Sequence, residues 1–258
     1  MPQVYLEMAI NDWTIKAGRF YTIIGYEVVQ APDNFFYSHA YTMYYGEPFT
    51  HTGFLASYAA SDNVTIHGGW TDGWDNGWGN ILGASTFLGG VSLGLSDDAT
   101  LTWACSAGSN GRAGGIDRGD VYMNSFVLDW SLTDKLTYIF QHDLGNISGL
   151  GVDNAQWYGI NQYLLYQFND CWAVGGRFEW FRDDDGQRIS TTEGGLGNEG
   201  NYYEITLGLN WKAHANLTIR PEVRYDWYNG NDDSGAEPFD NGTRSDQFSG
   251  GFDVIFTF

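Results

Sequence analysis

Hydrophobic and polar residues alternate with a period of two over long segments of the chain, most clearly over residues 216–228. One face of this segment carries Leu217, Ile219, Pro221, Val223, Tyr225 and Trp227, and the other carries Thr218, Arg220, Glu222, Arg224, Asp226 and Tyr228. Such alternation predicts a β-strand with one apolar and one polar face. Soluble strands usually have about 5–6 residues, whereas a tilted strand of ~9–11 residues crosses a bilayer. The segment therefore predicts a membrane-spanning strand.

The same pattern recurs along the whole chain and predicts about 13–14 strands of this kind. The predicted strands are 2–10, 13–21, 50–60, 64–72, 81–95, 99–108, 120–132, 135–144, 155–168, 171–182, 201–212, 216–228 and 245–258. An antiparallel sheet that presents an apolar face to lipid must close on itself, because an open edge leaves backbone groups without partners. We therefore expect an all-β fold, an antiparallel transmembrane β-barrel that forms a single domain over residues 1–258.

The connections between these strands alternate strictly between short and long. The long ones are 22–48, 73–80, 109–119, 145–154, 183–200 and 229–244, and the short ones are turns rich in Asn, Asp and Ser. Bacterial barrels have short periplasmic turns, long extracellular loops and an even number of strands. The first predicted strand ends in a short turn, so this parity predicts an odd number of further strands upstream and a parent barrel of about 14 to 16 strands.

Composition narrows the class of protein further. Aromatic residues make up 17% of the chain, yet its mean hydropathy is -0.33, and it has no apolar run of the ~18 residues that a membrane helix needs. The formal net charge of -20 argues against a nucleic-acid partner, which requires a basic surface. Abundant aromatic residues in a chain that is polar on average are typical of alternating strands in a bilayer.

Several stretches carry a resemblance to a known family. They are AGRFYTIIGYEVV at 17–29, APDNFFYSHAY at 31–41, PFTHTG at 48–53 and GGWTDGWDNG at 68–77. In these stretches the chain resembles the outer-membrane β-barrel porins of the OmpL-like porin-2 family. The resemblance is strong over residues 17–77 and fades afterwards to a shared strand pattern that ends in Phe258. It implies a barrel fold and a transport function, and it brings no catalytic motif and no particular solute.

These observations predict a porin of the Gram-negative outer membrane. The protein would let ions and small polar solutes diffuse passively through a water-filled barrel, because barrels of this size enclose an aqueous channel. Its partners would be outer-membrane lipid and the solutes themselves, with no cofactor, metal or enzymatic activity; a homotrimer and a monomer both remain open. The alternatives are a surface adhesin or receptor that acts through its acidic loops, and an outer-membrane hydrolase.

Charged residues on the predicted polar faces are candidates for the lining of the pore. They are Lys16, Arg177, Glu179, Glu204, Arg220, Glu222, Arg224 and Asp226. The three arginines of this set lie on nearby strands of a chain that has only 12 Lys and Arg residues. They could orient permeating solutes, since rings of charge set the selectivity of pores. They could also form ion pairs that stiffen the wall, and the two interpretations are compatible.

The predicted loop 22–48 is unusual in length and in aromatic content. Loops longer than ~12–15 residues are commonly functional, and this one carries Phe35, Phe36, Tyr37, Tyr41, Tyr44 and Tyr45. Its charged residues are Glu27, Asp33 and Glu47, with no Lys or Arg. We expect it to enter the lumen as a constriction loop, so that these acids face the basic wall and set up a transverse field. Packing over the rim, or on a neighbouring subunit, is the alternative.

Other candidate features favour structural interpretations. Seven tryptophans near strand ends, Trp70, Trp103, Trp130, Trp172, Trp180, Trp211 and Trp227, fit the aromatic belts of a membrane protein better than a sugar-binding row inside the lumen. The acidic clusters 183–185 and 229–233 are more typical of solvated loops than of calcium sites, because the EF-hand pattern is incomplete. Cys105 and Cys171 lie on strands too far apart for a disulfide.

Overall fold

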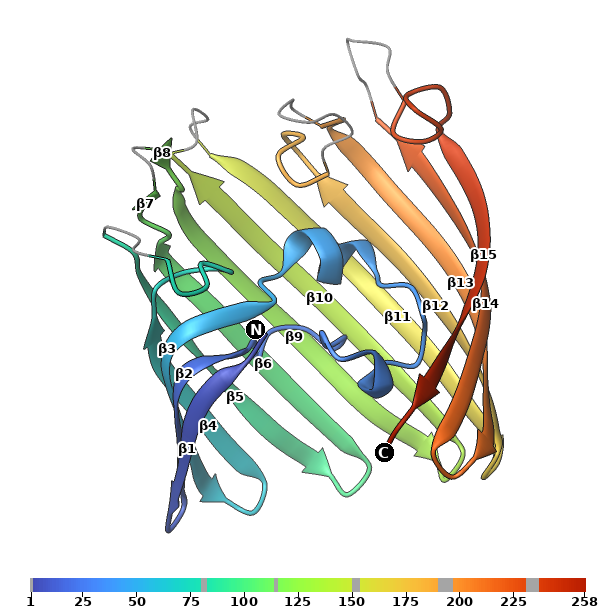
Figure 1. Ribbon diagram of the computed structural model, residues 1–258, viewed down its shortest axis with the longest axis horizontal. Coiled ribbons are helices and arrows are strands. Elements are labelled where there is room, and N and C mark those ends of the chain that lie inside the picture. The colour runs from blue at the N-terminus through green and yellow to red at the C-terminus, as the bar shows by residue number, and fades with distance from the viewer. Residues whose placement is uncertain (1, 80–82, 114–115, 150–153, 190–196, 231–236) are drawn as a thin grey trace. The chain divides into compact units, whose positions relative to one another are not determined.

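In the part of the chain that the structure describes, thirteen strands form one antiparallel sheet, in the order β1-β2-β3-β4-β5-β6-β9-β10-β11-β12-β13-β14-β15. The computed structural model describes residues 2–79, 83–113, 116–149, 154–189, 197–230 and 237–258 (Figure 1). The strands are β1 Val4–Ile10, β2 Trp13–Tyr21, β3 Thr50–Ser61, β4 Val64–Thr71, β5 Ser85–Ser96, β6 Ala99–Ser109, β9 Asp120–Thr133, β10 Leu136–Ser148, β11 Ala155–Asn169, β12 Trp172–Asp183, β13 Gly200–His214, β14 Leu217–Asn229 and β15 Asp246–Phe256. Among the described residues, no helix is long and apolar enough to cross a membrane.

The strands predicted from the sequence are confirmed, with their ends shifted by a few residues. The predicted strand 81–95 begins at Ser85 in the structure, and residues 81 and 82 lie outside the described residues. The predicted polar loop 109–119 contains a short hairpin of β7 Arg112–Ala113 and β8 Ile116–Asp117. Both cysteines are free thiols, Cys105 buried and Cys171 exposed.

The chain divides into two compact units. Unit 1 comprises residues 1–29, 47–128 and 143–156, and unit 2 comprises residues 30–46, 129–142 and 157–258. In unit 1, each strand from β1 to β6 pairs antiparallel with the next strand along the chain. In unit 2, β11 to β15 pair in the same way.

Unit 2 also contains the central part of the predicted loop 22–48. This part of the loop contains a short 3-10 helix, η1 Ala31–Asp33, and a single π-helical turn, η2 Thr42–Gly46. Figure 1 shows this segment, in blue to light blue, passing in front of the sheet. Hydrogen bonds with Arg177 and Glu179 on β12 and with Glu222 and Arg224 on β14 place it against these strands. The segment 31–46 is called the inner segment below, and the face of β12–β14 that it covers is called the inner face.

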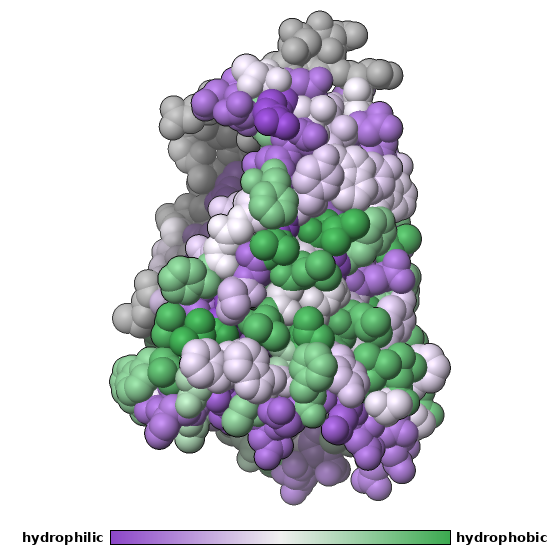
Figure 2. Space-filling view, turned by 90° about the vertical axis from the view of Figure 1, so that its right-hand side faces the viewer, coloured by the Kyte–Doolittle hydropathy of each residue, from purple (hydrophilic) through white to green (hydrophobic). Residues whose placement is uncertain are grey.

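Alternate residues of β12–β14 point to the inner and the outer face, as the period-2 pattern predicts. On β12, Phe178 is 37% exposed while its neighbours Arg177 and Glu179 are 1% and 0% exposed. On β14, Val223 and Tyr225 are exposed while Asp226 is buried. Figure 2, which looks toward the side that carries β14 and β15, shows a hydrophobic band between hydrophilic ends. The outer face is therefore the face suited to lipid.

Two rows of aromatic side chains border this outer face in unit 2. Trp172 and Trp211 stack at 5.3 Å between ring centroids, and Tyr203 and Trp227 stack at 5.1 Å, with Trp180 paired to Tyr203 in the same row. Eight residues of β12 separate Trp172 from Trp180, which corresponds to about 26 Å along the strand at ~3.3 Å per residue. With the strand tilted by ~40°, the two rows are about 20 Å apart along the membrane normal. Such spacing suits the thin bacterial outer membrane.

Candidate functional site

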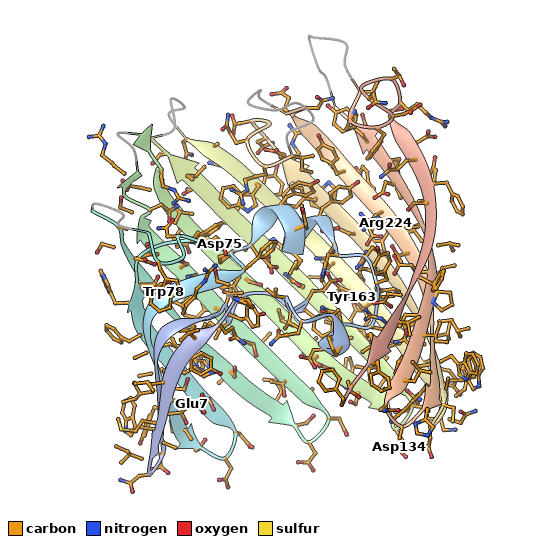
Figure 3. The ribbon with its side chains drawn as sticks, viewed as in Figure 1. Glu7, Asp75, Trp78, Asp134, Tyr163 and Arg224 are labelled. Carbon is orange, nitrogen blue, oxygen red and sulfur yellow. The ribbon has the colours of Figure 1, made fainter. Side chains whose placement is uncertain are left out.

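The candidate site is the inner face of β12–β14 together with the inner segment that lies on it. Seven of the eight predicted pore-lining residues come together here, and six of them are buried: Arg177, Glu179, Glu204, Arg220, Glu222 and Asp226. Arg224 joins them, with 11% of its side chain exposed. Figure 3 labels Arg224 on β14, on the side of the strands where the inner segment runs. The strand register explains this grouping, because Glu179 pairs with Glu204 and Glu204 pairs with Asp226 across neighbouring strands.

Glu179 binds the start of η2. Its carboxylate accepts hydrogen bonds from the backbone N–H of Tyr41 and Thr42, the second at 2.6 Å, and from the hydroxyl of Thr42. Both Glu179 and Thr42 are fully buried. Hydrogen bonds from backbone N–H groups to a carboxylate are charge-assisted and stronger than neutral ones. Glu179 therefore fixes the backbone of the inner segment at this point.

Arg177 is shared between the wall and the inner segment. Its Nε donates to Glu204 on β13, its Nη1 donates to the carbonyl oxygen of Ser38 at 2.8 Å, and its Nη2 donates to the Ser38 hydroxyl at 3.1 Å. The guanidinium group also lies 5.1 Å from the ring centroid of Phe36. A buried guanidinium requires such partners on every side, because an unpaired buried charge is strongly destabilising.

Arg220 and Glu222 hold the beginning of the inner segment. Arg220 forms an ion pair with Asp253 on β15 at 2.5 Å, and its Nη1 donates to the carbonyl oxygens of Ala31 and Asn34 at 3.0 and 2.5 Å. Glu222 accepts hydrogen bonds from the backbone N–H of Tyr37 at 2.8 Å and of Ser38 at 3.1 Å. The two neighbouring polar positions of β14 thus bind carbonyl oxygens and N–H groups of the same segment.

Arg224 and Asp226 form the third set of contacts. Their ion pair measures 2.6 Å, and Arg224 Nη1 donates to the carbonyl oxygen of His39 at 2.6 Å. The Tyr41 hydroxyl donates to Asp226 at 2.8 Å, while the guanidinium lies 5.0 Å from the centroid of the Tyr41 ring. The three arginines thus contact the inner segment directly, at hydrogen-bond distance, and no open gap separates them from it at these contacts.

Glycines on the inner face make room for the aromatic rings of the inner segment. A Cβ atom at Gly175 would lie 2.4 Å from the ring of Phe35, and one at Gly208 would lie 2.9 Å from the ring of Phe36. The Phe36 ring also lies 6.3 Å from the ring of Tyr163 on β11, between centroids. A real Cβ never approaches a ring carbon so closely, so these positions require glycine while the rings remain in place.

The end of the inner segment is held by residues that sequence reasoning missed. Trp157 on β11 donates from Nε1 to the carbonyl oxygen of Gly46 at 3.0 Å, and Arg188 donates to the carbonyl oxygen of Tyr45 at 2.5 Å. Arg188 lies in the loop after β12, where Asp183 accepts hydrogen bonds from the backbone N–H of residues 187, 188 and 189. Contacts to backbone carbonyls leave no sequence signal, because every residue carries one.

The remaining predicted site residues lie elsewhere. Lys16 forms an ion pair with Glu7 in unit 1, at 3.5 Å and with both side chains exposed. Glu27 and Glu47 are buried in unit 1, and a Cβ at Gly25 would lie 2.1 Å from a carboxylate oxygen of Glu47. Asp33 is exposed in η1. The transverse field that we expect from these three acids therefore stays a prediction.

Unit 1 has a bound loop of its own, in the segment that follows β4. The carboxylate of Asp75 accepts hydrogen bonds from the backbone N–H of Thr50 at 2.7 Å and of Phe49 at 3.1 Å. Trp74 is buried, and its Nε1 donates to the hydroxyl of Ser106 on β6 at 3.2 Å. The signal was present in the sequence, because both residues belong to the GGWTDGWDNG stretch that carries the family resemblance.

A serine and a histidine lie within hydrogen-bond distance in unit 1. Ser57 and His67, on the adjacent strands β3 and β4, are 2.8 Å apart between Oγ and Nδ1. A nucleophilic serine also needs an acid to orient the histidine, and no carboxylate bonds His67 within the described part of the chain. Nor do the described residues contain a group of three or more His, Cys, Asp or Glu side chains placed to hold a metal ion.

The whole chain matches a known protein family. A family model described as "Putative beta-barrel porin-2, OmpL-like" matches residues 1–258. No curated protein sequence matches the chain.

The fold is shared with solved outer-membrane proteins. The chain is similar to the outer membrane channel DcaP of Acinetobacter baumannii, with a TM-score of 0.67, 9% sequence identity, and coverage of 98% of this chain and 74% of that one. It is also similar to OmpT, an outer-membrane protein of Vibrio cholerae (TM-score 0.62, 13% identity, coverage 98% and 80%). OccK5 (OpdH) of Pseudomonas aeruginosa gives a TM-score of 0.60 at 11% identity, with coverage of 98% and 70%. At these identities the likeness shows the fold alone, which is the antiparallel outer-membrane β-barrel.

Proposed function

Because the chain belongs to the OmpL-like porin-2 family of β-barrel porins, we propose that it is a diffusion porin of the outer membrane in which the inner segment forms the constriction. The chain is an outer-membrane channel protein for small solutes, as the family and the channel neighbours indicate. Ions and small hydrophilic solutes cross such a barrel without chemistry, and the protein performs no enzymatic reaction. The polar inner face and the apolar outer face of β12–β14 support this function, since porins are polar inside and apolar outside.

One observation supports a constriction by the inner segment: the polar face of β12–β14 binds the backbone of residues 31–42. Arginines donate to its carbonyl oxygens, and Glu179 and Glu222 accept from its N–H groups. In a porin this polar face lines the channel, so a segment fixed on it occupies part of the cross-section. A charge-assisted hydrogen bond contributes roughly 1.5–3 kcal/mol, and several together favour a fixed position over a mobile loop.

Electrical recording tests the channel function directly. The full-length protein, refolded and inserted into planar lipid bilayers, should produce stepwise increases in current whose size scales with salt concentration. A correctly folded and inserted protein that carries no current would contradict the porin function, and the adhesin alternative would then be favoured. Binding of purified protein to host or bacterial surface components, with the acidic loops intact and then deleted, would test that alternative.

A further inference from the structure

A cavity of about 500 Å³ lies beside the inner segment in unit 2. It is bordered by residues 37–41, 44 and 45, by the inner face of β13–β15 at Tyr202, Arg224 and Gln247, and by Phe239. Tyr202 and Phe239 are buried, whereas Tyr37 and Tyr44 of the inner segment are 51% and 58% exposed. The cavity is therefore lined by two buried aromatic rings and by two tyrosine rings that are open to solvent.

Four of the tyrosines that line the cavity form a continuous cluster. Tyr41 stacks on Tyr45 at 5.9 Å between centroids, with 23° between the ring planes, and it contacts Tyr202 at 5.6 Å. Tyr44 packs edge-on against Tyr45 at 4.9 Å. Each of these rings thus packs against another ring, and the exposed Tyr44 ring packs against Tyr45. A rigid aromatic surface of this kind binds an apolar face at low entropic cost.

The cavity is electrically balanced. Arg224 is the cation that borders it, and its guanidinium already binds Asp226 at 2.6 Å and the His39 carbonyl at 2.6 Å. The second oxygen of Asp226 accepts a hydrogen bond from Gln247 at 3.1 Å. A charged solute would have to compete with these partners, whereas a neutral one would not. The hydroxyl groups of the exposed Tyr37 and Tyr44 supply hydrogen-bonding groups at the border without adding charge.

These observations point to a neutral solute that has an apolar face and a polar rim. We propose that the cavity binds sugar rings during permeation; this rests on the channel function proposed above. The C–H face of a pyranose ring packs on an exposed tyrosine ring, and its hydroxyl groups form hydrogen bonds with the hydroxyl groups of Tyr37 and Tyr44. An anion would instead need an unpaired arginine or lysine, and Arg224 is paired.

Current blockade by neutral sugars tests the proposal. Full-length protein in planar bilayers would be exposed to maltotriose, cellotriose and raffinose, and transient interruptions of the ion current would be counted. We expect at least one of them to interrupt the current of the wild-type channel. Loss of one stacked ring is worth about 0.5–1.5 kcal/mol, so Tyr44→Ala should weaken the blocking affinity by roughly 2- to 10-fold. Tyr44→Phe, which keeps the ring, should retain most of the affinity.

A matched control is available on the other face of the wall. Tyr225 on β14 is 41% exposed on the outer face, so Tyr225→Ala removes a tyrosine of similar exposure and should leave the blocking affinity unchanged. Current without blockade by any of the three sugars, or equal blockade of wild type and Tyr44→Ala, overturns the sugar site while the porin function stands. Stronger blockade by galacturonate or phenylacetate than by neutral sugars overturns it in favour of an anion site. Absence of any current from folded protein refutes the channel function itself.

Discussion

The two faces of β12–β14 are built from alternating residues of the same strands, yet they satisfy opposite requirements. The outer face exposes Phe178 and Val223 and lies between two aromatic rows. The inner face buries Arg177 and Glu179 almost completely, and their partners include backbone groups of the inner segment. Apolar side chains remain uncovered where lipid is the solvent, and charged side chains are covered where water would otherwise reach them. The inner segment, and not only the neighbouring strands, therefore supplies the partners of the polar side chains on the inner face.

The largest effect is expected from breaking a buried pair on the inner face. Arg177→Ala leaves Glu204 buried, with none of its side chain exposed, and removal of one partner of a buried pair costs about 3–5 kcal/mol. Urea unfolding of the full-length protein in detergent, followed by tryptophan fluorescence, measures this loss. The double variant Arg177→Met with Glu204→Leu should recover most of it. If Arg177→Ala is as stable as wild type, the pair does not hold the inner face.

A charge on the outer face should have the next largest effect. Val223 lies midway between Ile219 and Trp227 on β14, near the centre of the apolar band. An arginine at such a depth costs about 2–4 kcal/mol, so Val223→Arg should reduce the free energy of folding into lipid vesicles by this amount. Val223→Leu is the control and should fold normally. Normal folding of Val223→Arg would mean that the assignment of the two faces is inverted.

Adjacent glycines of β12 sharpen the comparison within a single strand. A Cβ at Gly175 would lie 2.4 Å from Phe35 on the inner face, whereas a Cβ at Gly176, on the outer face, would meet Leu207 at an ordinary 3.5 Å. Overpacking typically costs about 1–3 kcal/mol, so Gly175→Ala should loosen the inner segment and Gly176→Ala should not. Limited proteolysis within residues 31–46 measures the release. Equal cleavage of the two variants would show that Phe35 does not pack against this wall.

The smallest effect is expected from the exposed acid of the inner segment. Asp33 is exposed in η1, so its field is screened over a Debye length of about 10 Å at 0.1 M salt. Asp33→Asn should shift the reversal potential slightly toward anions at low salt, and the shift should vanish at high salt. A shift that persists at 1 M salt would instead indicate a structural change of the segment.

Much of the fold, but little of the site, was predictable from the sequence. The alternation around Val223 and Arg224 correctly predicts which side chains share a face, because that property depends only on position along a strand. It also predicts the antiparallel barrel fold that the family and the solved structures bear out. The contacts of Glu179 with the backbone of residues 41 and 42, and of Arg188 with the Tyr45 carbonyl, were not predictable. Those partners are backbone groups, which are the same in every residue.

The role of glycine on the inner face was equally hidden. Gly175 and Gly208 look like ordinary interruptions of strands in the sequence, and only the position of Phe35 and Phe36 explains them. The aromatic content of the loop did predict that its rings must pack somewhere, and Phe36 packs beside Arg177 and Tyr163. The alternation of polar and apolar residues therefore predicts which side chains share a face of the sheet. The distant residues that a loop contacts can be identified only from the structure.

Single-channel conductance of a loop deletion tests the central claim, that the inner segment is fixed on the channel wall and narrows the pore. The deletion removes Gln30–Tyr41 from the full-length protein, and with it the partners of Arg220, Glu222 and the Ser38 contact of Arg177. Folding is checked first by urea unfolding, so that only folded barrels are compared. We expect a clearly larger conductance than that of the wild type at the same salt concentration. An unchanged conductance in a folded barrel would place the segment outside the permeation path and show that it does not narrow the pore.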